Sequence, residues 1–234
     1  MTGRGFFVTG TDTDVGKTLV ACALLRAFAK SGLRVIGMKP VAAGAQLKDG
    51  VWINDDVEQL IAAGNVSAPR DLLNPYCFEL PLAPHIAADV QKISLKNKYI
   101  QEKYQSLSAL ADVVVVEGAG GFCVPFNDTE TSADLARELA LPMVLVVGMR
   151  LGCLNHALLT AEAIRARGLT LAGWVANHID PAMVHADANV AALQVRLGAP
   201  LIARIAFDES ADANVIASHF DPASGAGQPL RALL

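Results

Sequence analysis

Charged residues are scarce in this sequence, and neither sign of charge is in large excess. Asp, Glu, Lys and Arg make up 18% of the 234 residues, and the formal net charge is −4 at pH 7. Without a basic excess there is no field to hold nucleic acid or an anionic membrane. Because 53% of the residues are hydrophobic, we expect a second subunit to cover part of the surface.

Long apolar runs and paired cysteines are also missing. The longest apolar run, residues 139–149, is shorter than the roughly 18 residues that a membrane-spanning helix needs. The N-terminal apolar run ends at Val8 and leads directly into a loop, so we expect no signal peptide. No Cys-x-x-Cys pair occurs, and we interpret the cysteines as reduced core thiols of a cytoplasmic protein. They are Cys22, Cys77, Cys123 and Cys153.

The main chemical signal is a glycine-bearing loop at 10–18. It reads Gly-Thr-Asp-Thr-Asp-Val-Gly-Lys-Thr and lies between a predicted strand at 6–8 and a predicted helix at 19–25. This is the context of a phosphate-binding P-loop, in which Lys17 reaches the terminal phosphates and Thr18 holds Mg²⁺. Five residues instead of the usual four separate Gly10 from Gly16. An ordinary glycine turn before a helix is therefore the alternative interpretation.

Predicted strands alternate with predicted helices along the chain. The four valines at 113–116 indicate a strand that is buried on both faces and central in a parallel sheet. The other expected strands lie at 6–8, 33–38, 143–148, 171–177 and 200–207, and helices at 19–25, 54–63, 93–110, 132–140, 155–167 and 185–197. This order predicts an α/β fold, a single domain (1–234) with a doubly wound, mostly parallel sheet flanked by helices.

Two segments show no periodic pattern. Residues 41–46 are small and predict a loop. Residues 64–84 contain four prolines and predict an excursion from the core. We expect this excursion to be either a substrate-side loop or part of a subunit contact.

Polar residues follow several of the predicted strands, where ligands bind in such sheets. Lys39 offers a second positive charge for phosphoryl oxygens, and Glu117 offers an oxygen ligand suited to Mg²⁺. Asn177 could pair with a base edge or could simply form a turn. Asp56 is a weaker candidate, since an acid at a helix start needs no function. A nucleophilic role for Cys153 is not expected, because no convincing base accompanies it.

Five motifs together resemble one family. They are Gly-Thr-Asp-Thr-Asp-Val-Gly-Lys-Thr (10–18), Met-Lys-Pro-Val (38–41), Val-Glu-Gly-Ala-Gly-Gly (116–121), Leu-Gly-Cys-Leu-Asn-His-Ala-Leu-Leu-Thr (151–160) and Leu-Ala-Gly-Trp-Val-Ala-Asn (171–177). Their order and the unusual loop spacing are similar to those of the ATP-dependent dethiobiotin synthetases of biotin biosynthesis.

The resemblance implies a P-loop NTPase-like fold and a ligase that uses Mg²⁺ and ATP. In the implied reaction, 7,8-diaminononanoate takes up CO₂ as a carbamate. The carbamate attacks the γ-phosphate of ATP, and the second amine then closes the cyclic urea of dethiobiotin. A homodimer with the site at its interface is also implied, with no nucleic acid or membrane as partner.

The resemblance also assigns roles by motif position. Lys17 and Lys39 are the implied catalytic residues, and Thr18, Asp56 and Glu117 the implied metal ligands. Implied ATP contacts are Thr13, Asp14, Val15, Gly16, Lys17, Thr18, Leu19, Asp56, Glu117, Gly118, Ala119, Gly120, Asn177, His178, Ala206, Phe207 and Asp208. Implied substrate contacts are Lys39, Ala43, Gly120, Leu151, Cys153 and Asn155.

Three positions depart from the family pattern. Ala43 stands where a serine is usual, Ala206 where a proline is common, and Asn189 where relatives can offer an aromatic. The first change removes a hydroxyl contact to the carbamate, but none of the three removes a charge.

Two other functions are compatible with this fold. A nucleotide-dependent switch or partitioning ATPase would carry a second lysine early in the loop, and positions 11–15 contain none. An amide-forming ligase of the cobyrinate-modifying type would need a second catalytic domain, which we do not expect in 234 residues.

Overall fold

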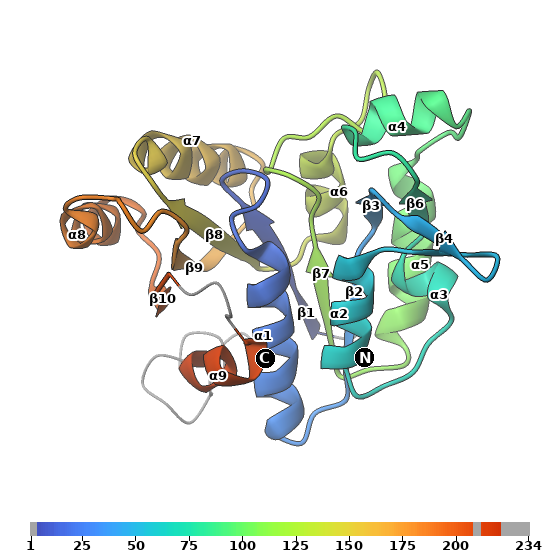
Figure 1. The fold of residues 1–234 in the computed structure, drawn as a ribbon, viewed down its shortest axis with the longest axis horizontal. Coiled ribbons are helices and arrows are strands. Elements are labelled where there is room, and N and C mark those ends of the chain that lie inside the picture. Colours follow the sequence, from blue (N-terminus) through green and yellow to red (C-terminus); the bar gives the residue numbers. More distant parts are fainter. Residues whose placement is uncertain (1–3, 208–211, 221–234) are drawn as a thin grey trace.

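Six parallel strands form the centre of the computed structural model, which describes residues 4–207 and 212–220 (Figure 1). Their order across the sheet is β10-β9-β8-β1-β7-β2, and each strand is parallel to its neighbours. The strands are β1 (Arg4–Gly10), β2 (Val35–Met38), β7 (Val113–Glu117), β8 (Met143–Met149), β9 (Leu171–His178) and β10 (Leu201–Ile205). The predicted α/β fold with a mostly parallel sheet is confirmed.

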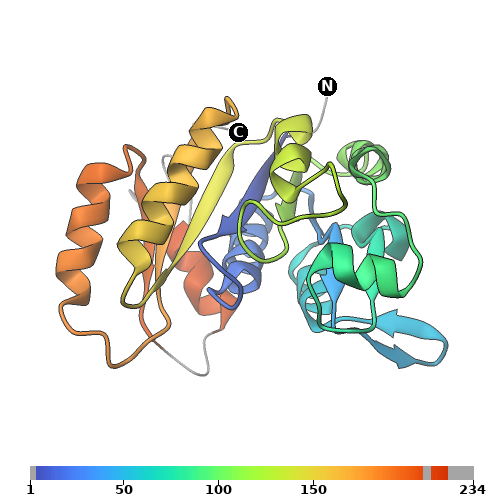
Figure 2. The ribbon, with the colours of Figure 1, turned by 90° about the horizontal axis from the view of Figure 1, so that it is seen from above.

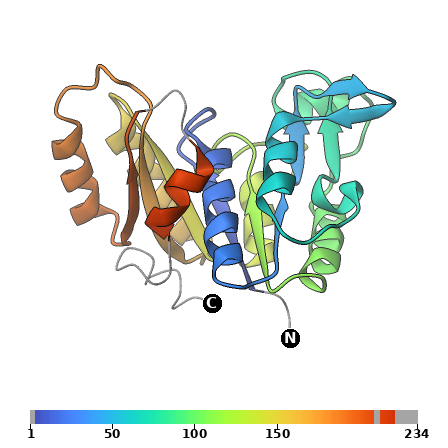
Figure 3. The same ribbon diagram turned by 60° about the horizontal axis from the view of Figure 1, so that its bottom comes forward.

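Helices cover both faces of this sheet. On one face α1 (Lys17–Lys30), α2 (Asp55–Ala63) and α9 (Ala213–Ala217) lie side by side, as Figure 3 shows. The other face carries α5 (Asn97–Ser108), α6 (Ser132–Leu139), α7 (Cys153–Ala166) and α8 (Ala186–Arg196), which Figure 2 shows from above. A short turn of 3₁₀-helix, Ser218–Phe220, follows α9. None of the described helices is long and apolar enough to cross a membrane.

The valine-rich strand β7 explains how the sheet joins two apolar layers. Successive side chains of a strand point to opposite faces. Val113 and Val115 accordingly pack with α1, whereas Val114 and Val116 pack in the layer on the α5 side. All four valines are at most 1% exposed, and β7 lies between β1 and β2. The prediction of a strand buried on both faces is confirmed.

Polar side chains cap the starts of the helices that were predicted at 132–140 and 54–63. The Thr131 side chain accepts a hydrogen bond from the Asp134 backbone N–H, and the Asp134 carboxylate accepts one from the Thr131 N–H. This reciprocal capping box satisfies donors that the first turn of α6 leaves free. At α2 the carbonyl oxygen of the Asn54 side chain accepts hydrogen bonds from the N–H groups of Asp56 and Val57, which fixes where Asp56 stands.

The two segments without a periodic pattern contain ordered elements. β3 (Val41–Ala43) pairs in parallel with β6 (Tyr76–Phe78), and β4 (Gln46–Lys48) forms an antiparallel hairpin with β5 (Val51–Ile53). The prediction of a loop over 41–46 was therefore wrong. Residues 64–84 also contain α3 (Arg70–Leu73), and α4 (Pro84–Val90) begins at their end. Strands of three residues are too short to show an alternating hydrophobic pattern in the sequence. They are stabilised by their pairing with distant segments.

Two of the four cysteines lie outside the core. Cys22 and Cys153 are buried, but Cys77 is half-buried and Cys123 is exposed. The interpretation of all four as core thiols was therefore wrong. Cys123 stands in the irregular segment that follows the glycines after β7, where no strand or helix turns it inward.

Candidate functional site

A cavity of about 1010 Å³ opens at the carboxyl ends of β1, β2 and β7. Its position follows the rule that ligands bind beyond the carboxyl ends of parallel strands. The structure brings half of the residues predicted to contact ATP or substrate together here. Those that line the cavity are Thr13, Asp14, Gly16, Lys17, Thr18, Lys39, Ala43, Asp56, Glu117, Ala119 and Gly120.

Lys39, Asp56 and Glu117 form an ionic cluster beside the phosphate loop. The Nζ atom of Lys39 donates to Oδ2 of Asp56 at 2.8 Å and also to Oε1 of Glu117. Glu117 is fully buried and Lys39 is 6% exposed, so the pair lies in a medium where charges interact strongly. The hydroxyl of Thr18 donates to the same Oε1 of Glu117 at 2.9 Å. The cluster thus links the ends of β2 and β7 to the start of α1 and α2.

The two cavity lysines have opposite pKa shifts. Burial lowers the pKa of Lys39, but the carboxylates of Glu117 and Asp56 outweigh burial and hold it above 10.5. Burial, followed by the like charge of Lys39, holds the pKa of Lys17 below 10.5. In the part of the chain that the structure describes, Lys17 donates only to a neutral acceptor, the backbone carbonyl of Asp12, at 2.8 Å. Lys17 therefore has the greater need of an anionic partner.

The carboxyl group of Asp56 is expected to make the stability of the folded protein depend on pH. Burial raises its pKa, but Lys39 outweighs burial and holds the pKa below 3.8. A carboxyl group with a lowered folded-state pKa stabilises the folded protein above its unfolded-state pKa and loses this effect as pH falls through the folded-state pKa. We expect Asp56→Asn to unfold at a lower temperature than the unmodified chain at neutral pH. The difference should shrink as pH falls below 3.8, as thermal scans followed by circular dichroism would show. A difference that stays constant in acid would contradict the assignment.

The phosphate loop depends on contacts from β8 and β9. Gly16 has a φ of 89°, and a Cβ atom there would lie 2.3 Å from Nδ2 of Asn177. That nitrogen donates to the backbone carbonyl of Val15 at 2.9 Å, and Asn177 is 7% exposed. Asn177 therefore holds the backbone of the loop in place. A glycine is needed at position 16 because no Cβ atom fits between the loop backbone and the Asn177 side chain.

Several residues at or near the cavity were not among the predicted site residues. Residues 81–84 line it, so the end of the 64–84 excursion lies at this cavity. Val124 lines it as well. Arg150 follows β8 and its Nη2 lies 2.5 Å from Oδ2 of Asp12, so it anchors the loop at its outer end. The rule that drew attention to Lys39, a polar residue directly after a buried strand, also applies to Arg150.

The remaining predicted residues do not line this cavity. Val15 is a buried residue of the loop itself, Cys153 is buried at the start of α7, and Leu151 is 95% exposed. Asn189 is half-buried on α8 and donates to the His185 carbonyl. Leu19, Gly118, Asn155, His178, Ala206 and Phe207 are also outside the lining, and Asp208 lies outside the described residues. Their predicted contacts with ATP or substrate stay predictions.

A parallel sheet whose first strand leads through a phosphate loop into α1 defines the class of P-loop NTPases. Solved structures of this class are similar to the chain. A ParA family ATPase from Chlorobium tepidum matches with a TM-score of 0.55 at 13% identity, covering 98% of this chain and 96% of that one. The septum site-determining protein MinD with Mg-ADP from Pyrococcus horikoshii matches with a TM-score of 0.55 at 20% identity, covering 100% and 94%. At such identities the likeness shows the fold.

Sequence comparison identifies the family within this class. A family model described as "AAA domain" matches residues 4–214. ATP-dependent dethiobiotin synthetase BioD of Aromatoleum aromaticum is 55% identical over 92% of this chain and 96% of its own length. The enzyme of the same name from Nitrosospira multiformis is 54% identical over 94% and 95%. The chain belongs to the ATP-dependent dethiobiotin synthetase family, as the motifs indicated.

Proposed function

We propose that this chain is an ATP-dependent ligase that converts 7,8-diaminononanoate and CO₂ to dethiobiotin, with release of ADP and phosphate. One structural observation carries the proposal beyond family membership. Lys17 and Lys39, two buried lysines, line the same cavity as the phosphate loop. Two cations at this place suit a reaction in which both a triphosphate and a carbamate bring negative charge.

The phosphate loop would bind and orient ATP. The backbone N–H groups around Gly16 and the N-terminus of α1 attract phosphate oxygens. Lys17, whose present partner is a neutral carbonyl, would exchange this contact for the terminal phosphates. Asn177 and Arg150 would keep the loop in shape while the nucleotide enters.

Lys39 would act on the reacting groups. In the first step a carbamate oxygen forms a bond to the γ-phosphorus, and the bond between this phosphorus and the bridging oxygen of ADP breaks. The product of this step is a carbamic-phosphoric anhydride. In the second step the other amine attacks the carbamate carbon of the anhydride and expels phosphate. Lys39 would stabilise the negative charge on the carbamate and on the transferred phosphoryl group. Positioning replaces a strong base here, because a carbamate and an amine are adequate nucleophiles once aligned.

The side chains of Thr18, Asp56 and Glu117 fit a Mg²⁺ ion. They offer the hard oxygen donors that this ion prefers, and Oε2 of Glu117 is buried without a hydrogen-bond partner. The described residues contain no cluster of three or more His, Cys, Asp or Glu that could hold a metal by itself. These three side chains would therefore share the ion with phosphate oxygens and water. When bound, Mg²⁺ would neutralise phosphate charge.

We also propose that the enzyme is a cytoplasmic homodimer whose chains each form a single domain, with no nucleic acid or membrane as partner. The segment around the start of α7 supports the dimer. Leu151 is 95% exposed and Asn155 is exposed, although the family resemblance assigns both to the substrate. A second copy covering this segment would bring these residues into a closed site.

The second candidate function is that of a partitioning or switch ATPase. The ParA and MinD neighbours support it only at the level of the fold. The loop lacks a lysine at positions 11–15, and relatives at 54–55% identity are ligases by name. The ligase is the better supported function.

Phosphate release tests the two candidates against each other. Purified protein with Mg²⁺-ATP and bicarbonate is expected to release phosphate only when 7,8-diaminononanoate is added, because the carbamate is the attacking group. A coupled phosphate assay measures the rate, and mass spectrometry identifies dethiobiotin as the product. Phosphate release at the same rate without the diamine would refute the ligase function and favour the ATPase.

A further inference from the structure

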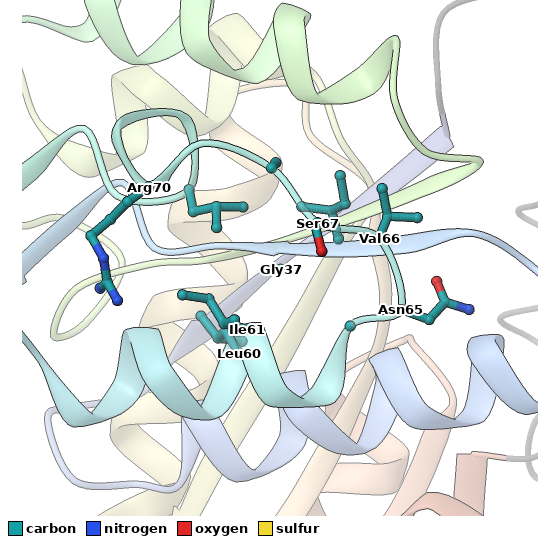
Figure 4. A pocket seen from close by; sticks show the side chains of 11 residues that line it. Gly37, Leu60, Ile61, Asn65, Val66, Ser67 and Arg70 are labelled. Carbon is teal, nitrogen blue, oxygen red and sulfur yellow. The ribbon is translucent and has the colours of Figure 1, made fainter.

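A second cavity, of about 400 Å³, lies at the outer edge of the sheet (Figure 4). It is enclosed by β2, by α2 and by the segment that leads from α2 to α3. Leu60 and Ile61 of α2 lie on one side of Gly37 in Figure 4, and Val66 and Ser67 lie on the other. This cavity shares no lining residue with the catalytic cavity, and its volume is in the range of small-molecule sites.

The edge of β2 leaves one backbone position open towards this cavity. Alternate residues of a strand direct their N–H and C=O groups to opposite sides, and β2 has a neighbour, β7, on one side only. On the free side, the Val35 N–H donates to the side chain of Asn65 at 2.8 Å, and the Lys39 N–H donates to the Leu73 carbonyl at 2.8 Å. Gly37 stands between these two positions.

Gly37 has no such partner among residues 4–207 and 212–220. It is buried, and it lines the cavity. Buried backbone groups in proteins are nearly always hydrogen-bonded. An adjacent donor and acceptor that face a cavity therefore indicate a ligand with the complementary pair, a C=O beside an N–H, as in an amide or a cyclic urea.

The other residues that line the cavity indicate which further groups a ligand would carry. Ile36, Leu60 and Val66 give part of its wall an aliphatic character, and the Ser67 hydroxyl lies beside Gly37 in Figure 4. Arg70 stands at one end in Figure 4. Among the described residues, only its Nη1 is engaged, by Glu58 at 2.6 Å. The other guanidinium nitrogens are available to a carboxylate.

We propose that this cavity binds a small molecule that combines an amide-like head group, an aliphatic body and a carboxylate. The head group pairs with the backbone of Gly37, the body packs between α2 and the 64–70 segment, and the carboxylate binds Arg70. Dethiobiotin has this pattern, with a cyclic urea, an alkyl chain and a carboxylate, so this choice of ligand rests on the proposed function. The cavity is then a second site for the product. Its elements β2 and α2 are also those that present Lys39 and Asp56 to the reaction.

The amide resonance of Gly37 provides the direct test. The full chain, labelled with ¹⁵N, is first saturated with Mg²⁺, a non-hydrolysable ATP analogue and 7,8-diaminononanoate, so that the catalytic cavity is filled. Dethiobiotin is then titrated in. We expect the Gly37 amide to shift in a saturable way. Arg70→Gln should weaken this binding by about tenfold, the effect of one hydrogen bond to a charged group.

A matched variant controls for the loss of a surface ion pair. Lys103→Gln breaks the pair with Asp71, which is outside the cavity, and should bind dethiobiotin as the unmodified chain does. No shift of the Gly37 amide, or equal affinity in Arg70→Gln and Lys103→Gln, would overturn the proposal. So would binding that disappears when the catalytic cavity is filled.

The two proposals can fail separately. A chain that makes dethiobiotin but shows no shift at Gly37 lacks the second site and keeps its function. A chain that shows the shift but makes no dethiobiotin keeps the site and refutes the function.

Discussion

Replacing Lys39 by alanine is expected to lower turnover at least tenfold and, on the scale of removing one group that stabilises developing charge, by about 10²–10³-fold. The affinity for an ATP analogue should change little, because the phosphate loop and Lys17 remain. Lys39 stands directly after β2 between two carboxylates and lines the cavity, where we propose that it acts on the reacting groups. Steady-state kinetics and a nucleotide-binding titration separate the two effects.

The control for this variant is Lys103→Ala. Lys103 also forms an ion pair, with Asp71 at 2.7 Å, but on α5 and away from the cavity, so its turnover should match that of the unmodified chain. Both variants must first show the same circular dichroism spectrum at the assay temperature. If Lys39→Ala loses ATP affinity as strongly as it loses turnover, Lys39 serves binding only.

Replacing Glu117 by glutamine is expected to lower the free energy of unfolding by about 3 kcal/mol, the lower end of the range for breaking a buried ion pair. The change preserves the shape of the side chain but removes its charge, and Lys39 then keeps only the partly exposed Asp56 as a partner. For a domain of this size, the melting temperature should fall by roughly 6–12 °C. Chemical denaturation followed by tryptophan fluorescence measures the change.

Arg34 and Asp112 provide the matched surface pair. Their atoms approach to 2.8 Å, but the side chains are 60% and 39% exposed. Arg34→Gln should therefore change stability by less than about 1 kcal/mol. If Glu117→Gln is no less stable than Arg34→Gln, then Asp56 alone compensates the buried charge of Lys39.

Local sequence signals predicted the sheet and the helix starts well. The four valines of β7 predicted a strand buried on both faces because burial on both sides selects apolar residues at every position. The helix predicted at 132–140 begins where expected, because the capping box of Thr131 and Asp134 is complete within one turn of chain. Such signals need no knowledge of the rest of the molecule.

The candidate site was predicted in part for a related reason. Lys17 lies at the end of the loop, Lys39 directly after β2, and Glu117 at the last position of β7. Parallel strands bring their carboxyl ends to one edge. Topology thus gathers residues that are far apart in the chain. Residues 81–84 escaped prediction because the short strand before them, β6, was not predicted. They reach the cavity through the pairing of β3 with β6.

The contacts of Asn177 and Gly37 could not be predicted from the sequence. From the sequence, Asn177 follows a buried strand and could have faced either a base or a turn. Packing places its amide under Val15. Gly37 is one glycine in a short strand, and its open backbone follows only from the position of β2 at the edge of the sheet. The burial pattern of the strands, the helix caps and the polar residues at strand ends follow from the sequence alone, because each depends on residues close together in the chain. Which distant segments pair is decided by the tertiary structure, because backbone hydrogen bonds form between groups that every residue carries.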